Sequence, residues 1–310
     1  MTVPEFHDLA EAALNHESGG WTCWGNLGCW AQARTYPDAC AALADELATA
    51  LQLNPRTHLI DIGFGSGDQL LHWRTRYGVR HIAGLNLSHS QTDFAKQRLV
   101  DHGHADIAGC IRQGDASELP TWVAAAPVAA DTILALDCAY HFGSRQNFVA
   151  DVAQVLPAGG RLGMTDIILG RPRLKLHEHA ALRVISRLSH LPWNNLQSED
   201  RYRGVWHAAG FELESWADIT DQVFEPFGDW LTRYQASLDP EVARRIRWTK
   251  YNATAGFLRW AARNGVLRYV VCVGRKRSRA ARGRRQARLL GADGGYGPPL
   301  DLPATPRVLA

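Results

Sequence analysis

Leu59-Ile60-Asp61-Ile62-Gly63-Phe64-Gly65-Ser66-Gly67-Asp68 is the most informative stretch of this 310-residue chain. Its first four residues are typical of a buried β-strand, and the alternating glycines predict a tight turn into a helix. Glycine leaves the backbone bare, so a ligand can lie directly against the main chain. The free N–H groups and the positive end of the helix dipole would attract a negatively charged group of that ligand.

Composition limits the class of protein. The chain is long enough for one large domain or two small ones, and its apolar fraction of 46% supports a sizeable core. The N-terminus lacks the pattern of a signal peptide, and no apolar run approaches the ~20 residues of a membrane span. We therefore expect a cytoplasmic protein without membrane insertion. The six cysteines lack zinc-site spacing, so we expect no metal site.

Basic residues concentrate near the C-terminus. Eight Lys and Arg and no acid lie from Arg275 to Arg288, whereas the other 26 basic residues are outnumbered by 31 acidic ones. Residues 276–310 are basic and then rich in Gly and Pro, which is typical of a disordered tail. Such a tail could contact nucleic acid or an acidic membrane surface. Because no aromatic residue is interleaved with the charges, we expect no nucleic-acid partner.

Strand-like and helical patterns alternate from His58 onward, which is typical of an α/β fold. The predicted strands are 58–63, 80–86, 108–113, 131–137, 161–166, 211–216 and 267–274. The predicted helices are 38–51, 68–77, 88–102, 146–156 and 240–263, and residues 171–210 are expected to be helical with a break at 191–195. We expect an N-terminal helical cap over residues 1–57, a main domain over 58–275, and the tail over 276–310.

Residues 19–30 combine three tryptophans with four glycines, which does not suit a regular element. We expect a loop that lays aromatic rings against another surface. Trp21, Trp24, Trp30 and Trp193 all fall in predicted loops. Together they favour an aromatic pocket, which suits an apolar, aromatic or cationic molecule.

Polar motifs follow three more of the predicted strands. They are Gly84–Gln91, Gly114–Ala116 and Ala135–Phe142. The carboxyl ends of neighbouring strands in an open parallel sheet meet at one crevice. We therefore expect the glycine turn and these three motifs to line a single pocket.

The ordered set of motifs resembles the class I S-adenosylmethionine (SAM) methyltransferases that act on small molecules. That group includes sugar O-methyltransferases, sarcosine/dimethylglycine N-methyltransferases, tocopherol and sterol C-methyltransferases, and mycolic-acid cyclopropane synthases. Its members pair a DxGxGxG turn, here Asp61–Gly67, with a GxxxSxxQ segment, here Gly84–Gln91. Val155–Leu162 resembles the stretch before their fifth strand. The resemblance spans Trp24 to Gly274.

This resemblance implies a Rossmann-like, doubly wound fold. Its sheet would have seven strands, mostly parallel, with the seventh antiparallel. Residues 170–210 would form a helical lid.

The resemblance also implies where SAM would bind. At the methionine end, Gly63, Gly65 and Gly67 would pass under the cofactor. Asp61 would orient the loop and the amino group, and Leu136 would lie near the sulfonium.

At the nucleoside end, the resemblance implies that Asn86 and Gln91 hold the ribose hydroxyls. Asp115 would accept from the adenine amine, and the Ala116 N–H would face the ring. Trp30 lies in a GCW segment that resembles the family's GYW, which closes over the cofactor.

His141 and Asp166 are the catalytic candidates, because similar sugar O-methyltransferases have a His and an Asp at these places. The His would take a hydroxyl proton, and the Asp would orient it or hold a cationic substrate. We therefore expect methyl transfer to a small, largely apolar metabolite of secondary metabolism, with oxygen favoured as the acceptor.

Several alternatives stay open at this point. They are C-methylation of a prenyl alkene, N-methylation of an amine, methylation of nucleic acid, and SAM binding without catalysis. A homo-oligomer is compatible with the sequence.

Overall fold

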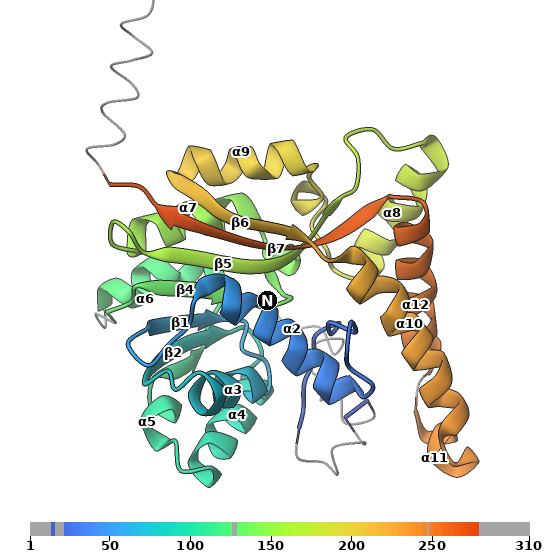
Figure 1. The fold of residues 1–310 in the computed structure, drawn as a ribbon, viewed down its shortest axis with the longest axis horizontal. Helices are drawn as coiled ribbons and strands as arrows, with labels where there is room; N and C mark the ends of the chain where they lie inside the picture. The colour runs from blue at the N-terminus through green and yellow to red at the C-terminus, as the bar shows by residue number, and fades with distance from the viewer. Residues whose placement is uncertain (1–13, 16–21, 126–128, 247, 279–310) are drawn as a thin grey trace, which may run out of the picture.

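The computed structural model describes residues 14–15, 22–125, 129–246 and 248–278. A seven-stranded sheet runs through this part of the chain in the order β3-β2-β1-β4-β5-β7-β6 (Figure 1). The strands are β1 (His58–Ile62), β2 (His81–Asn86), β3 (Ile111–Gln113), β4 (Thr132–Ala135), β5 (Arg161–Leu169), β6 (Phe211–Asp218) and β7 (Leu267–Lys276). Each of them corresponds to a strand predicted from the sequence.

Five neighbouring strands, β3, β2, β1, β4 and β5, are parallel to one another. β7 lies between β5 and β6 and is antiparallel to both. Strand order reverses between β1 and β4, so a crevice opens beyond their carboxyl ends. The predicted doubly wound, mostly parallel sheet with an antiparallel seventh strand is confirmed. β5 extends three residues beyond its predicted end, because β7 pairs with it from Arg161 to Leu169.

Helices pack on both faces of the sheet and make two hydrophobic cores (Figure 1). The first core draws on α2 (Tyr36–Leu51), α3 (Asp68–Arg76), α4 (His89–Asp101), α5 (Ala105–Ala108), α10 (Thr220–Ser237) and α12 (Trp248–Arg263). The second draws on α6 (Leu119–Ala125), α7 (Arg145–Val155) and α9 (Glu199–Ala209). α8 (Leu176–Leu188) adds Leu182 to the first core, and the short helix α11 (Pro240–Arg245) precedes α12. β1 is buried along nearly its whole length because both of its faces are covered.

α10 is absent from the helices predicted by the sequence patterns, although it has 18 residues. Pro226 and Gly228 lie inside it, and both residue types argue against a helix interior. Packing overrides that local preference, because α10 buries an apolar face and lies along α12 (Figure 1). The helix predicted over 240–263 is divided into α11 and α12.

The predicted N-terminal helical segment is only partly described. α2 begins at Tyr36, where Thr35 caps it by accepting the Asp38 N–H. Residues 22–35 contain no helix. The remainder of the segment, residues 1–13 and 16–21, and the tail from residue 279 lie outside the described residues, so the predictions made for them stay predictions.

Candidate active site

A cavity of about 550 Å³ opens at the carboxyl ends of β1, β2 and β4. All four motifs that the sequence predicts to share a pocket contribute to its wall. The aromatic loop, which we define as residues 22–30, covers one side through residues 23–27. Residues of α8, α10 and α12 close the other side.

The three glycines of the turn have different surroundings: two line the cavity and one packs against a helix. Gly63 and Gly65 line the cavity with positive φ values of 80° and 56°. A Cβ on Gly65 would meet nothing within 4 Å, so its space opens into the cavity. Gly67 does not line the cavity, and a Cβ there would lie 2.9 Å from that of Ala95. The packing of α3 against α4 therefore accounts for Gly67, whereas its predicted contact with the cofactor has no support from its position.

The Asp61 carboxylate is hydrogen-bonded to other side chains of the protein and does not face the cavity. Its carboxylate is fully buried and accepts hydrogen bonds from the Gln69 amide at 2.7 and 2.9 Å and the Trp73 indole at 2.7 Å. Burial raises the pKa of Asp61 to about 7. These bonds hold α3 to β1, so Asp61 does orient the loop. The predicted contact with the amino group has no support from its position, because Gln69 lines the cavity and Asp61 does not.

Asn86 and Gln91 line the cavity together, as the sequence predicts. The Asn86 side chain accepts from the Gly65 N–H at 3.2 Å and donates to the Gln91 side chain at 3.2 Å. Asn86 thereby ties the glycine turn of β1 to the end of β2. Leu136 also lines the cavity, directly after β4.

Asp115 and Ala116 line the cavity at the end of β3. Asp115 also begins a short 3-10 helix, η2 (Ala116–Glu118), where its carboxylate accepts the Ser117 N–H at 2.8 Å. Glu118 closes the capping box by accepting the Asp115 N–H at 2.9 Å. The cap fixes the carboxylate in place, and its cavity position lets it face a ligand as well.

Trp30, which the resemblance places over the cofactor, does not line the cavity. Its ring is buried against Phe227 and Trp230 of α10, with ring centroids 6.3 and 5.0 Å away. Its backbone N–H donates to the Gln222 carbonyl at 2.7 Å. Trp30 therefore anchors the aromatic loop to α10. Cys29, in the place of the family's tyrosine, donates its thiol hydrogen to the Gln222 side chain.

Two carboxylates hold the aromatic loop over the glycine turn. Asp68, the first residue of α3, accepts the Cys23 N–H at 3.0 Å and pairs with Arg98 at 2.6 Å. Asp137, after β4, accepts the Leu27 N–H at 2.7 Å. Neither residue is among the site residues predicted from the sequence. The usable signal is that Asp68 directly follows the glycine turn and that Asp137 lies within the Ala135–Phe142 motif.

Asp137 is buried and lines the cavity, as Asp68 does. The hydroxyls of Tyr140 and Tyr269 donate to it at 2.9 and 2.7 Å, and its own N–H donates to the Thr165 hydroxyl at 2.7 Å. Its backbone has a positive φ of 55°. Burial raises its pKa to about 6, although these donors favour the charged form.

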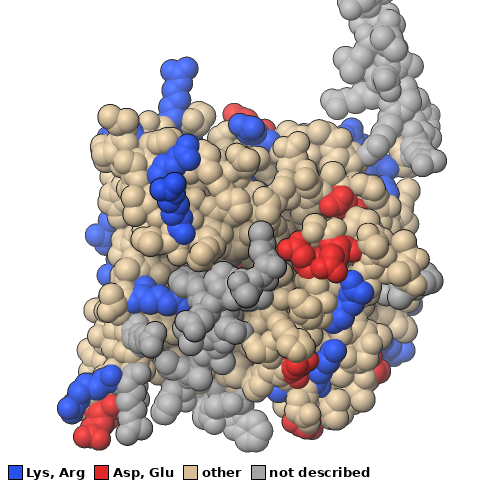
Figure 2. Space-filling view, turned by 180° about the vertical axis from the view of Figure 1, so that it is seen from behind, with Lys and Arg blue, Asp and Glu red and all other residues tan. Residues whose placement is uncertain are grey.

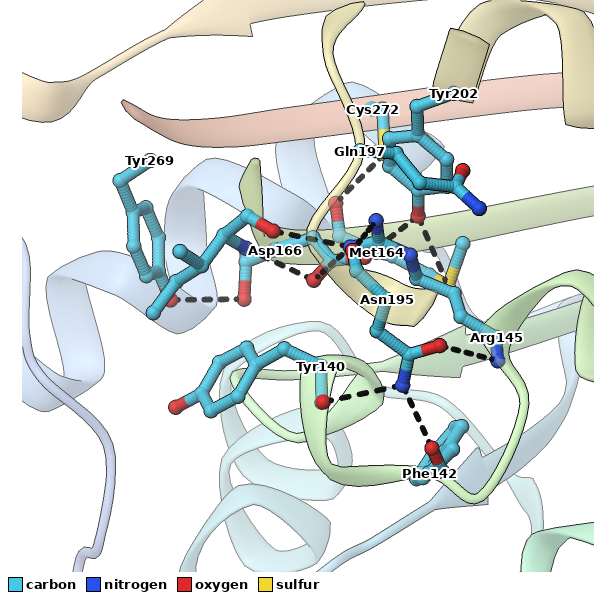
Figure 3. Close-up of polar contacts among 12 residues, drawn as sticks. Tyr140, Phe142, Arg145, Met164, Asp166, Asn195, Gln197, Tyr202, Tyr269 and Cys272 are labelled. Atoms are coloured by element: carbon cyan, nitrogen blue, oxygen red, sulfur yellow. Dashed lines mark hydrogen bonds and ion pairs between the residues drawn. The ribbon is translucent and has the colours of Figure 1, made fainter. Parts of the chain in front are cut away.

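His141 lines the cavity at the end of the 3-10 helix η3 (Ala139–His141), with its ring against that of Tyr140. The backbone carbonyls of the residues on either side, Tyr140 and Phe142, accept from the Asn195 side chain at 3.2 and 2.6 Å (Figure 3). Asn195 lies in η4 (Trp193–Asn195), between α8 and α9. The predicted catalytic His is therefore in the cavity.

Asp166, the second catalytic candidate, is fully buried and does not line the cavity, so its predicted catalytic role has no support from its position. It pairs with Arg145 at 2.8 Å and accepts from the Tyr202 hydroxyl at 2.6 Å (Figure 3). Burial raises its pKa, and Arg145 opposes that shift. Side chains alternate along a strand, so the preceding residue, Thr165, points toward Asp137 while Asp166 points away.

Apolar side chains dominate the part of the cavity remote from the glycine turn. They are Leu14, Ile167, Ile185, Leu188, Leu191, Phe227, Tyr251, Phe257, Leu258 and Leu267. Of the four tryptophans expected in an aromatic pocket, Trp24 lines the cavity. Trp193 instead meets His179 edge to face and lies under the Arg183 guanidinium, and Trp21 lies outside the described residues. Aromatic rings do face the cavity, but most come from helices.

The predicted lid over residues 170–210 separates into two parts. Ile185 and Leu188 of α8, together with Leu191, line the cavity. α9 instead packs against β6 and α7.

The described residues contain no cluster of three or more His, Cys, Asp or Glu that could hold a metal ion. Within the same residues, no helix has the length and apolar character needed to cross a membrane.

Comparison with known proteins adds a family match. Residues 29–263 match the mycolic acid cyclopropane synthetase family. The chain is 28% identical to the 27-O-demethylrifamycin SV methyltransferase of Amycolatopsis mediterranei, over 82% of this chain and 91% of that protein. It is also 28% identical to the erythromycin 3''-O-methyltransferase of Saccharopolyspora erythraea, over 72% and 73%.

Among solved structures, the fold is similar to that of the cyclopropane synthase MmaA2 from Mycobacterium tuberculosis. The TM-score is 0.62 at 19% identity, over 87% of this chain and 95% of that one. The similarity places the fold among Rossmann-like methyltransferases.

Proposed function

Because the chain belongs to the mycolic acid cyclopropane synthetase family of SAM-dependent methyltransferases, we propose that it methylates a hydroxyl oxygen of a small, largely apolar metabolite. The observation that carries this proposal is the placement of His141. His141 follows β4 and lines the same cavity as Leu136 and as the apolar residues of α8 and α12.

The residues of the cavity fit SAM. Gly65 leaves open space beside a bare backbone, as a cofactor lying against the main chain requires. Gly63, Gly65 and Leu136 would hold the methionine end, and Asn86, Gln91, Asp115 and Ala116 would hold the nucleoside. When bound, SAM supplies an electrophilic methyl group, so the protein must align and desolvate the acceptor.

Two observations support the chemical class of the methyl acceptor: the apolar lining of the cavity and the names of the relatives. Both relatives described above are named O-methyltransferases, one for a rifamycin and one for erythromycin. Apolar side chains from α8, α10 and α12 would bury the body of such a molecule. We propose a hydroxylated product of secondary metabolism as the acceptor class.

His141 would act as the general base. A ring nitrogen would take the proton of the acceptor hydroxyl, which makes the oxygen a stronger nucleophile. Histidine suits this role because its ordinary pKa lies closest to neutral pH. The aromatic loop and α8 would exclude water from the reacting groups.

C-methylation of a prenyl alkene is the second candidate. The observation that favours it is the presence of Phe227, Tyr251 and Phe257 in the cavity wall, because aromatic faces stabilise a carbocation. The same rings would suit the cationic product of N-methylation. The position of the transferred methyl group separates these reactions.

Transfer from SAM with a carbon-13 methyl group tests the proposal. The enzyme is given hydroxylated macrolactones and macrolactams, a prenyl diphosphate and small amines, and the labelled product is analysed by NMR. We expect the chemical shift of a methoxy carbon. A labelled methyl on carbon or nitrogen would overturn the assignment to oxygen.

His141→Ala tests the base. We expect kcat to fall about 100-fold or more, with SAM affinity near that of the wild type. His179→Ala is the matched control, because His179 packs against Trp193 and does not line the cavity. Wild-type turnover by His141→Ala across the pH range would exclude His141 as the base.

Methylation of nucleic acid through the basic tail is tested by ending the chain after Ser278. Retained turnover of the small acceptor by the shortened protein would count against a role of the tail in catalysis. Loss of that turnover together with salt-sensitive binding of nucleic acid would favour the alternative.

A further inference from the structure

Asn195 is buried at 2% exposure, and both hydrogens of its side-chain amide are used on one short turn. They go to the carbonyls of Tyr140 and Phe142, the residues on either side of His141 (Figure 3). An asparagine amide has two N–H donors, so this pair of bonds uses its whole donating capacity.

The turn has little support of its own. η3 is three residues long, and its internal bonds are His141 N–H to the Cys138 carbonyl at 2.9 Å and Phe142 N–H to the Ala139 carbonyl at 3.2 Å. Neither bond uses the Tyr140 or Phe142 carbonyl. The Asn195 amide therefore supplies the two bonds that fix the backbone on both sides of His141.

Asn195 is itself held rigidly. Its side-chain oxygen accepts the Arg145 N–H at 3.0 Å, and its backbone carbonyl accepts from the Arg145 guanidinium. Arg145 is buried, donates to the Ile167 carbonyl at 3.0 Å and pairs with Asp166 at 2.8 Å. The amide is thus anchored to β5 and to the start of α7 through a buried ion pair (Figure 3).

Asn195 does not line the cavity. It comes from η4, four residues after Leu191, the last cavity residue of the α8 segment. It therefore joins the turn that carries His141 to the segment that covers the acceptor end.

We propose that Asn195 is a positioning residue for methyl transfer, clamping the η3 backbone so that the His141 imidazole points at the acceptor hydroxyl. This inference rests on the proposed role of His141 as the base. Because a displacement of about 1 Å can cost about 100-fold in rate, Asn195→Ala should lower kcat by roughly 10- to 100-fold. KM for SAM should stay near the wild-type value, since no cofactor-binding residue is altered.

A double-mutant cycle on the full chain tests the proposal. Turnover, normalised to the stoichiometry of SAM binding, is measured for Asn195→Ala, His141→Ala and the double variant. If Asn195 acts through His141, the second substitution causes no further loss in the His141→Ala background. Equal fractional losses in both backgrounds would overturn the proposal, because a purely structural role does not depend on His141.

The pH profile gives a second readout. Asn195→Asp keeps the size of the side chain but replaces its two donors with a carboxylate near His141. We expect the acid limb of the kcat profile to move to higher pH, because a nearby negative charge raises the pKa of an imidazole. An unmoved acid limb would overturn the proposal.

Asn194→Ala is the matched control, because Asn194 is the exposed neighbouring amide. It should retain wild-type kcat. The outcome for His141→Ala separates the two hypotheses. If that variant is fully active, the proposed base is wrong. If it is impaired and Asn195→Ala is not, only the positioning role is wrong.

Discussion

Asp137 accepts the backbone N–H of Leu27 at 2.7 Å, so a residue at the end of β4 holds a loop 110 positions earlier in the chain. Asp68 holds the same loop through Cys23. These two bonds shape the cavity wall opposite α12. Both carboxylates lie beside the glycine turn, where the cofactor would bind.

Asp137→Asn should reduce the pH dependence of stability. The folded pKa of Asp137 is raised from 3.8 to about 6, so the folded state holds its proton more tightly than the unfolded state. Stability from this group is complete below pH 3.8 and is lost as pH rises through 6. The loss amounts to about 3 kcal/mol. Asparagine cannot titrate and still offers an oxygen to Leu27.

Urea unfolding of both proteins from pH 4 to 7 measures the difference. Asp61, whose folded pKa is also raised, to about 7, contributes equally to both proteins. The wild type should lose about 2 kcal/mol more than the variant over this range, because part of the loss occurs below pH 4. If the free energy of unfolding falls with pH by the same amount in both proteins, Asp137 does not titrate in this range.

Gly65→Ala should weaken SAM binding while the protein still folds. The added methyl group enters open cavity space and meets no protein atom within 4 Å. It would overlap the cofactor, so we expect affinity to fall roughly tenfold or more by calorimetry. The positive φ adds about 1–2 kcal/mol of backbone strain.

Gly159→Ala is the control for that strain. Gly159 has a φ of 84° and equally open surroundings, but it lies outside the cavity. It should lose stability without losing affinity for SAM. Wild-type affinity in Gly65→Ala would show that the cofactor does not lie over this turn.

Asp115→Asn should lower SAM affinity by about tenfold, measured by calorimetry. The asparagine oxygen can still cap Ser117, but the other atom becomes a donor facing the adenine amine, which is also a donor. Asp131→Asn is the control, because Asp131 accepts the His58 N–H at the opposite end of the sheet. If Asp115→Asn binds SAM normally, the residue serves only as a helix cap.

Asp166→Asn should destabilise the fold without disabling the chemistry. It leaves the buried Arg145 cation without its counter-charge, which costs about 3–5 kcal/mol. Chemical denaturation measures that loss. kcat per SAM-binding site should stay within about twofold of the wild type, because Asp166 does not line the cavity and Arg145 keeps its bonds to the Ile167 and Asn195 carbonyls.

Arg145→Met/Asp166→Leu serves as the companion variant. Apolar replacement of a buried ion pair is often neutral or stabilising, so it should recover much of the lost stability. A large fall in kcat in well-folded Asp166→Asn protein would restore the catalytic assignment that the structure argues against.

Sequence-based prediction succeeded where the signal is local. The strands could be predicted because each is a short apolar run bounded by turn residues, and Asn86, Gln91, Asp115 and His141 because each follows such a run. α10 could not be predicted in this way. Pro226 and Gly228 interrupt its pattern, and only its contact with α12 outweighs them.

Trp30 and Asp61 show a second limit. Both belong to motifs that do surround the cavity, so their motif membership suggested a ligand. Their polar groups are instead used within the protein, by Gln222 and Leu27 for Trp30 and by Gln69 and Trp73 for Asp61. A motif predicts where a backbone segment lies. The hydrogen-bond partners of each side chain depend on residues elsewhere in the chain, which the motif does not contain.

Local patterns were enough to predict the doubly wound sheet and the crevice at its carboxyl ends, because apolar strands followed by turns such as Gly63-Phe64-Gly65 specify where each strand stops. Contacts between distant parts of the chain settle whether Asp137 or Asp166 faces the cavity. Asp137 does so because Tyr269, 132 residues later, and Leu27 of the aromatic loop both converge on it. Asp166 points the other way because side chains alternate along β5, and on that buried side it forms an ion pair with Arg145.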